Sequence, residues 1–314
     1  MKRRKMAKRL LTALLSFFIF MNVVAMFHAY KFTHFADSNV VKTRDAKDLS
    51  TSGKIRTILF GIDNPRPVNK TKPAQKFETI ILQSNKAIEC WSVKADNARG
   101  TVIIFHGFSG NKSTMLDKSD EFLKLGYNTF LVDFMGSGGS EGNQTTIGFQ
   151  EAEEVKTCYD YLAESGEKKI FLFGTSMGAV AILKALNDHN LDPAAIIIEC
   201  PFGSMYQTTC ARFKSLNIPT FPMAALLVFW GGIENGFWAY SFRPAEYAKA
   251  IRCPALLLYG GKDEKVSRQE IDEIFENMNC KKQLRTYPLA GHENYLKKYR
   301  EQWKEDILSF LRSL

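Results

Sequence analysis

The pentapeptide GTSMG at residues 174–178 constrains this chain more than any other feature. It follows apolar, strand-like residues at 169–173 and precedes an apolar, helix-like run at 179–186. A strand that turns sharply into a helix around a central serine presents that serine as an exposed nucleophile. Glycines on either side allow backbone angles and close approaches that a β-carbon would obstruct. The pattern therefore predicts a nucleophilic Ser176; the alternative is an ordinary turn in which Ser176 only caps the helix.

A serine nucleophile needs a base, and the chain contains five histidines. His28 and His34 lie in and just after an apolar N-terminal run, and His189 ends a helix-like segment. His106 ends an apolar strand, where it is better placed to shape the mouth of the sheet. His292 follows a strand-like segment and precedes the last helix, so we expect it on a loop at the carboxyl edge of the sheet.

The acid that orients this histidine is expected on another loop at the same edge. Asp263 follows an apolar run through a glycine turn. The chain order Ser176, Asp263, His292 is that of nucleophile-elbow enzymes and differs from the order in other serine triads. Asp263 would hold the imidazole in the useful tautomer. Glu264, the next residue, and Glu199, at the end of an earlier strand, remain alternative acids.

These motifs resemble those of an α/β-hydrolase over about residues 77–314. The resemblance rests on TVIIFHGFSG at 101–110, VDFMGSGGSEG at 132–142, GTSMG, YGGKD at 259–263 and GH at 291–292. It is greatest to the branch of serine esterases and serine-aminopeptidase-like hydrolases. In that family two backbone N–H groups form an oxyanion hole, and the resemblance implies those of Phe108 and Met177. The family usually has an arginine at the position of Met135.

The alternation of elements predicts a mostly parallel, eight-stranded sheet with helices on both faces and an antiparallel pair at its start. Strand-like segments occur at 77–83, 87–94, 101–106, 128–134, 169–173, 194–199, 255–260 and 283–288. Helix-like segments occur at 113–126, 147–165, 178–189, 268–279 and 295–313. We therefore expect an α/β-hydrolase catalytic domain at 76–314, with a helical cap insert at 201–247.

The amino terminus is a separate part of the chain. Six basic residues at positions 2–9 precede a charge-free run at 10–30, which is long enough to cross a bilayer. The alternative is a cleaved secretory signal, with Val23 and Ala25 as its cleavage pattern. The positive cluster predicts a cytoplasmic tail at 1–9 and an extracytoplasmic catalytic domain in both cases. The enzyme would be membrane-anchored if the segment is retained and secreted if it is cleaved.

Residues 31–75 are mixed in composition and are expected to form a juxtamembrane spacer. The stretch contains an apolar patch at 58–60, and one segment of it is expected to pack on the catalytic domain.

The charge of the chain gives no sign of a nucleic-acid partner. The formal net charge is +9, with 42 Lys and Arg against 33 Asp and Glu. Without the six basic residues of the tail, 36 Lys and Arg remain against 33 Asp and Glu. Most of the net positive charge therefore lies in the tail, where it is expected to set the orientation of the chain in the membrane. The glycine-rich stretch at 136–142 lacks the last glycine of G-x-G-x-x-G, and the six cysteines show no metal-ligand spacing. We expect no metal and no organic cofactor; the oligomeric state is not predicted.

The cap insert is long and aromatic. Phe229, Trp230 and Trp238 are candidates for an acyl or aryl pocket, and the alternative is that the rings form the cap's own core. Residues 219–233 are also apolar enough to touch a bilayer without spanning it. A membrane-tethered enzyme with an apolar cap points to small-molecule or lipid-like esters as substrates.

Together, these expectations favour a membrane-anchored serine hydrolase that cleaves carboxylic esters through an acyl-serine intermediate. An aminopeptidase or amidase could use the same triad, although the cap shows no acidic cluster for a free amino terminus. A thioesterase or acyltransferase would differ only in the leaving group or in water exclusion. A non-catalytic binding scaffold of this fold would be expected to have lost a triad member.

Overall fold

The computed structural model describes residues 2–41, 43, 50–215 and 217–314. Residue 1 of the predicted tail, residues 42 and 44–49 of the predicted spacer and residue 216 of the predicted cap lie outside the described residues.

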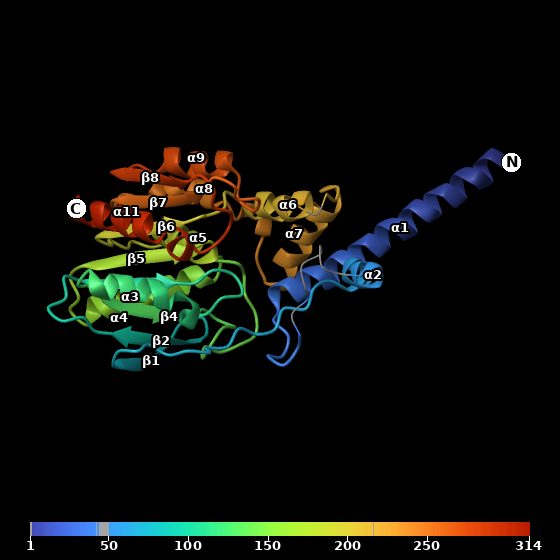
Figure 1. The fold of residues 1–314 in the computed structure, drawn as a ribbon. Helices are drawn as coiled ribbons and strands as arrows, with labels where there is room; N and C mark the ends of the chain where they lie inside the picture. Colours follow the sequence, from blue (N-terminus) through green and yellow to red (C-terminus); the bar gives the residue numbers. More distant parts are fainter. Residues whose placement is uncertain (1, 42, 44–49, 216) are drawn as a thin grey trace.

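An eight-stranded sheet forms the centre of the protein, in the order β1-β2-β4-β3-β5-β6-β7-β8 (Figure 1). Its strands are β1 (Phe77–Gln83), β2 (Ala87–Val93), β3 (Thr101–Phe105), β4 (Asn128–Val132), β5 (Ile170–Thr175), β6 (Ala195–Glu199), β7 (Ala255–Gly260) and β8 (Lys282–Tyr287). The strands from β3 to β8 are parallel, whereas β2 is antiparallel to both β1 and β4. This confirms the predicted mostly parallel sheet and adds a second antiparallel pairing.

Helices cover both faces of the sheet, and its central strands are therefore buried on both sides. Within β3, Val102 and Ile104 face one helical layer, whereas Ile103 and Phe105 face the other. The first layer contains α3 (Leu116–Lys124) and α11 (Arg300–Arg312), preceded by the short helices η2 (Lys112–Met115) and α10 (Tyr295–Lys298). The second layer contains α4 (Glu151–Glu164), α5 (Met177–Asp188) and α9 (Arg268–Asn277).

A helical insert lies between β6 and β7, where the cap was expected. It contains α6 (Met205–Ser215), α7 (Met223–Glu234), η3 (Ala239–Ser241), α8 (Pro244–Tyr247) and η4 (Ala248–Ala250). The first two helices stand at the end of the sheet that faces the amino-terminal helix (Figure 1).

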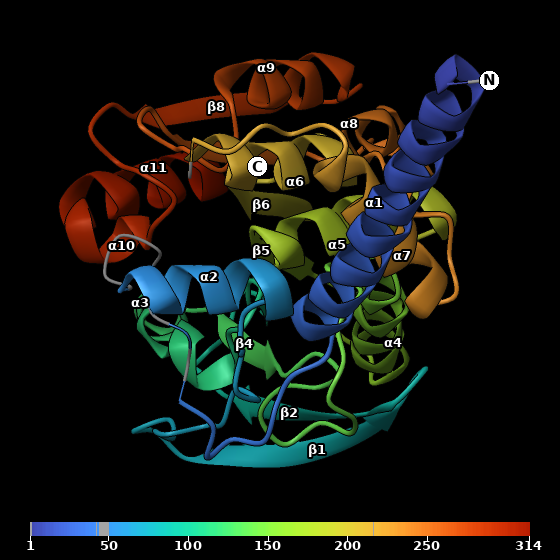
Figure 2. The same cartoon turned by 90° about the vertical axis from the view of Figure 1, so that its right-hand side faces the viewer.

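The amino-terminal helix α1 (Lys2–Thr33) contains the whole predicted apolar segment. Among the described residues it is the one helix long and apolar enough to cross a membrane. Its first two thirds are exposed and project away from the sheet, whereas its last third lies beside α7 and α2 (Thr51–Phe60) (Figures 1 and 2).

The spacer contacts the catalytic domain away from its apolar patch at 58–60. Ile58 and Phe60 remain more than half exposed on α2. Instead, the Arg66 guanidinium donates hydrogen bonds of 2.5–3.0 Å to three carbonyls of the glycine-rich loop, those of Gly138, Ser140 and Gly142. This loop therefore receives a guanidinium from the spacer, although Met135 stands where the resembling family usually has an arginine.

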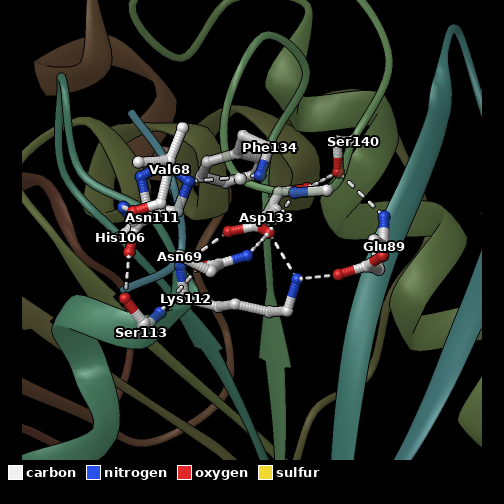
Figure 3. A network of polar contacts seen from close by, with 12 residues as sticks. Val68, Asn69, Glu89, His106, Asn111, Lys112, Ser113, Asp133, Phe134 and Ser140 are labelled. Carbon is white, nitrogen blue, oxygen red and sulfur yellow. Dashed lines mark hydrogen bonds and ion pairs between the residues drawn. The ribbon is translucent and has the colours of Figure 1, made fainter. Parts of the chain in front are cut away.

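A buried polar network joins the loop after β3 to the loop after β4 (Figure 3). One Asp133 oxygen accepts from the Lys112 backbone N–H at 2.7 Å. The other accepts from the Lys112 ammonium, from Asn69 at 2.7 Å and from the Gly139 N–H at 2.8 Å. The Lys112 side chain is fully buried, and its ammonium also pairs with Glu89 at 2.6 Å. Because a buried charge is costly unless it is paired, this network depends on each of its members.

Removal of Asp133 would leave the Lys112 ammonium buried with one partner fewer. We expect Asp133→Ala to lower the free energy of unfolding by about 3–5 kcal/mol, measured by denaturant unfolding of the full-length protein in detergent. Asp160→Ala is the control, because the Asp160–Lys156 pair lies on the half-exposed surface of α4 and contributes about 0.3–0.5 kcal/mol. Equally small losses in both variants would contradict the role assigned to Asp133.

Candidate active site

The turn between β5 and α5 has the strained geometry expected of a nucleophile elbow. Ser176 has φ +52° and ψ −108°, a conformation that costs a residue with a β-carbon about 1–3 kcal/mol. A β-carbon at Gly174 would come within 2.6 Å of the Gly178 backbone, and one at Gly178 within 2.5 Å of the Phe105 carbonyl oxygen. The two glycines are therefore required by close packing. The Ser176 side chain makes no capping hydrogen bond, which excludes the alternative of a simple helix cap.

The structure brings the three predicted side chains into one hydrogen-bonded chain. The Ser176 Oγ lies 3.1 Å from His292 Nε2, and His292 Nδ1 lies 2.7 Å from Asp263 Oδ2. The Asp263 side chain is fully buried, and its second oxygen accepts from the backbone N–H groups of Lys265 and Val266. A carboxylate only accepts hydrogen bonds, so the imidazole proton lies on Nδ1. Nε2 is then free to accept the serine proton.

Neither alternative acid reaches His292. Glu264 is exposed on the surface. The buried Glu199 carboxylate instead accepts from the Thr175 hydroxyl at 2.9 Å and from the Trp303 indole at 2.8 Å. It therefore ties β5 and β6 to α11 behind the site.

His106 has a structural role in the loop that follows β3. Its Nδ1 donates to the Gly107 carbonyl at 2.8 Å, and its Nε2 accepts from the Phe134 N–H at 3.1 Å. Burial lowers the pKa of His106, which favours the neutral ring that this pairing requires. The imidazole therefore fixes the loop that carries Phe108, in agreement with the shaping role expected from the sequence.

Phe108 and Met177 lie where the resemblance places the oxyanion donors, after β3 and at the first position of α5. In the described part of the chain, no protein acceptor takes either N–H. Both donors are therefore available to a ligand, and the rigid turns on either side of them limit their reorientation.

The end of α1 also reaches this site, which sequence reasoning missed. The ring of Phe32 stacks on that of Phe108, with centroids 4.6 Å apart and planes 9° apart. Phe35 packs on Phe108 at 6.1 Å, and the Arg212 guanidinium of α6 lies 5.3 Å from the Phe32 ring. No local pattern marked Phe32, because it lies at the start of the predicted spacer at 31–75, just after the charge-free run.

The three candidate pocket residues lie on the α1 side of the cap. The Trp230 indole donates to Asn22 of α1 at 3.2 Å, and the Phe229 ring packs edge-to-face on Trp230 and Trp238. Within the described residues, their hydrogen bonds and ring contacts join them to α1 and to other cap aromatics, not to Ser176 or His292.

Cys200, directly after β6, lies beside the triad. Its thiol, Asp263 and His292 offer potential metal ligands within 4.8 Å of one another. A metal ion held there would replace the hydrogen bond between Asp263 and His292. We therefore treat these residues as part of the triad and assign no metal site.

The sheet, the elbow and the Ser–His–Asp chain define the α/β-hydrolase class. The family model described as "Serine aminopeptidase, S33" matches residues 96–228, which include Ser176. The solved esterase Pf2001 of Pyrococcus furiosus is similar over 79% of this chain and 96% of that chain, with 24% identity and a TM-score of 0.68. The chain therefore has the α/β-hydrolase fold.

Curated relatives match most of the chain at low identity. The uncharacterized protein YqkD of Bacillus subtilis is 25% identical over 72% of this chain and 76% of its own length. The uncharacterized membrane protein YNL320W of Saccharomyces cerevisiae is 24% identical over 73% of this chain and 76% of its own length. The lysophosphatidylserine lipase ABHD12 of Danio rerio is 25% identical over 71% and 61%, respectively.

Replacement of each acid by its amide distinguishes the roles of Asp263 and Glu199. We expect Asp263→Asn to retain the fold but lower the rate by about four orders of magnitude, because the imidazole would adopt the wrong tautomer. Glu199→Gln is the matched control, since an amide oxygen can still accept from the Trp303 indole, and it should retain most of the activity. Steady-state ester hydrolysis measures both. The reverse order of effects would assign the acid to Glu199.

The pH dependence follows from the surroundings of His292. Burial opposes the imidazolium, but Cys200 and Asp263 favour it, and the net effect raises the pKa of His292 above its ordinary value of 6.5. Because the neutral ring is the base, reactivity should rise as the pH rises through this pKa. We expect the rate of fluorophosphonate labelling to have a midpoint above pH 6.5. A rate already at its plateau below that pH would contradict the assignment.

Proposed function

We propose that this protein is a membrane-anchored serine hydrolase that cleaves carboxylic esters through an acyl-serine intermediate. The observation that carries the proposal is the continuous hydrogen-bonded chain from Ser176 through His292 to the buried Asp263. Its geometry suits proton transfer, because the distance between Ser176 Oγ and His292 Nε2 lies within hydrogen-bond reach.

In the proposed acylation step, His292 Nε2 accepts the Ser176 proton while the Oγ forms a bond to the ester carbonyl carbon. The backbone N–H groups of Phe108 and Met177 stabilise the negative charge on the carbonyl oxygen, each by about 100- to 1000-fold in rate. The tetrahedral intermediate then expels the alcohol, which takes the proton from the imidazolium. Asp263 stabilises that imidazolium while it exists.

In the deacylation step, water takes the place of the alcohol. His292 accepts a proton from the water, whose oxygen attacks the acyl carbon. Collapse of the second tetrahedral intermediate breaks the bond to Ser176 Oγ and releases the carboxylic acid. The hydroxyl regains its proton from the imidazolium, which restores the free enzyme.

The cap favours esters over aminoacyl amides. A site for a free amino terminus must offset the burial of its charge with a paired carboxylate. Among the described cap residues, Glu246 pairs with Lys249 on the surface, and burial raises the pKa of Glu234 to about 7. In the described residues, neither carboxylate makes a hydrogen bond or ion pair with Ser176, His292 or Asp263. An aminopeptidase, amidase, thioesterase or acyltransferase remains the alternative, and the lipase name of the Danio rerio relative favours lipid-like esters.

The proposed topology places residues 1–9 in the cytoplasm, α1 across the membrane and the catalytic domain outside the cytoplasm. Retention of α1 is favoured over cleavage because Ala25 and Ala29 are buried in the protein. Cleavage near position 25 would remove part of this packing. The relative in Saccharomyces cerevisiae is likewise named a membrane protein.

A substrate panel with Ser176→Ala tests the proposal. We expect the wild type to hydrolyse short- and medium-chain acyl esters faster than matched thioesters or aminoacyl amides, and to react covalently with a fluorophosphonate. Ser176→Ala should abolish labelling and lower turnover by at least about a thousandfold without loss of the fold. Full labelling of Ser176→Ala would contradict the assignment of Ser176 as the nucleophile. Faster cleavage of aminoacyl amides than of every ester would show that the protein is a peptidase and not an esterase.

A further inference from the structure

The last third of α1 forms a packed helix pair with α7 of the cap (Figure 2). Ala25 is fully buried and Ala29 is 4% exposed. A β-carbon at Gly231 of α7 would lie 3.9 Å from the Ala29 Cβ, and the Trp230 indole donates to Asn22. Small residues allow two helices to approach closely, as they do inside membranes. The catalytic domain is therefore fixed to α1 by direct packing.

This helix pair fixes how deep the cap would lie in the bilayer. The charge-free run ends before Lys31, and Asn22 lies nine positions earlier in the same helix. At 1.5 Å per residue, these positions are about 13 Å apart along the axis, close to half of a hydrocarbon core about 30 Å thick. If residues 10–30 span the bilayer, then α7, which packs beside Asn22 and Ala29, lies within the adjacent leaflet.

The elements that contact this pair, α2 and the cap, carry exposed apolar side chains. On α2, Ile55 and Ile58 are 55% and 57% exposed, and Leu59 continues the same face at helical spacing. This helix lies beside α1, where His28 Nε2 is 2.8 Å from the Ile58 carbonyl oxygen. The cap adds three exposed side chains, Phe221, Ile233 and Trp238. We call these six side chains the leaflet face; clusters of exposed apolar side chains are typical of interaction sites.

We infer that the leaflet face is inserted in the same leaflet that α1 enters, and that Ser176 takes its substrate from that leaflet. Phe32 lies immediately after Lys31 and stacks on Phe108, so the proposed oxyanion loop stands where α1 leaves the hydrocarbon. The substrate class is an amphiphilic ester whose acyl chain lies in the bilayer and whose ester group lies at the headgroup level. This inference deepens the proposed function and rests on the proposed anchor.

Tryptophan fluorescence tests the depth of the cap. The chain has four tryptophans: Trp230 and Trp238 in the cap, and Trp91 and Trp303 buried in the catalytic domain. The full-length protein would be reconstituted in phosphatidylcholine vesicles with brominated acyl chains, which quench only nearby indoles. We expect quenching in Trp91→Phe/Trp303→Phe and none in Trp230→Phe/Trp238→Phe. Absence of quenching in both double variants would show that the cap stands above the bilayer and overturn the inference.

A matched pair of variants tests the substrate route. Ile233 on the leaflet face and Ile81 on the outer strand β1 are each 54% exposed. Ile233→Asp should lower hydrolysis of a long-chain monoacylglycerol in vesicles by about tenfold, since a carboxylate is costly in hydrocarbon. It should leave hydrolysis of a water-soluble butyrate ester unchanged, and Ile81→Asp should leave both unchanged. Equal rates for the two variants on the vesicle substrate would contradict entry from the leaflet.

Two further readouts distinguish this inference from the function on which it rests. A wild type inactive on both esters would contradict the proposed esterase activity. Hydrolysis of the soluble ester without quenching would contradict only the insertion of the leaflet face. Release of the protein by an alkaline carbonate wash would overturn the anchor and, with it, the insertion.

Discussion

The strained turn at Ser176 is the constraint on which the candidate site depends. Its positive φ is held by a hydrogen bond of 2.8 Å from the Ser176 N–H to the Glu199 carbonyl and by the close approach of Gly178 to the end of β3. The same turn points the serine hydroxyl toward His292 and leaves the Met177 N–H without a protein acceptor. One local conformation would thus supply both the proposed nucleophile and a proposed donor for the oxyanion, and buried strands on both sides hold it in place.

Buried polar groups fix the segments that surround the elbow. Glu199 links β5 and β6 to α11, whereas Asp133 and Lys112 link the loop after β3 to the glycine-rich loop. These groups are costly to bury unless they are paired, so each loop is fixed by partners on another segment. The spacer joins the same arrangement through Arg66 and Asn69. The segment before the catalytic domain is therefore part of the support of the site.

The position of α1 links the proposed chemistry to the proposed membrane anchor. An enzyme on a flexible tether could act on any ester in solution, and its anchor would only raise its concentration at the surface. Here the helix packs against the cap at Ala25 and Ala29 and reaches Phe108 through Phe32. The proposed oxyanion loop is therefore held at a fixed height relative to the helix. This geometry is the physical basis for the proposed preference for substrates that reside in the lipid.

The sequence by itself determined the order of strands and helices, the elbow at Ser176 and the edge loops of Asp263 and His292. These features follow from local periodicity and from the rule that parallel strands end at one edge of the sheet. Only the tertiary structure showed that His292 meets Asp263 and not Glu199, since both lie where strands end at that edge and differ in the partners their carboxylates meet. It also placed Phe229, Trp230 and Trp238 on the α1 side of the cap, and brought Phe32 and Arg66 to the catalytic domain. Such contacts join segments far apart in the chain, and local patterns indicate which face of an element is buried but not which distant element covers it.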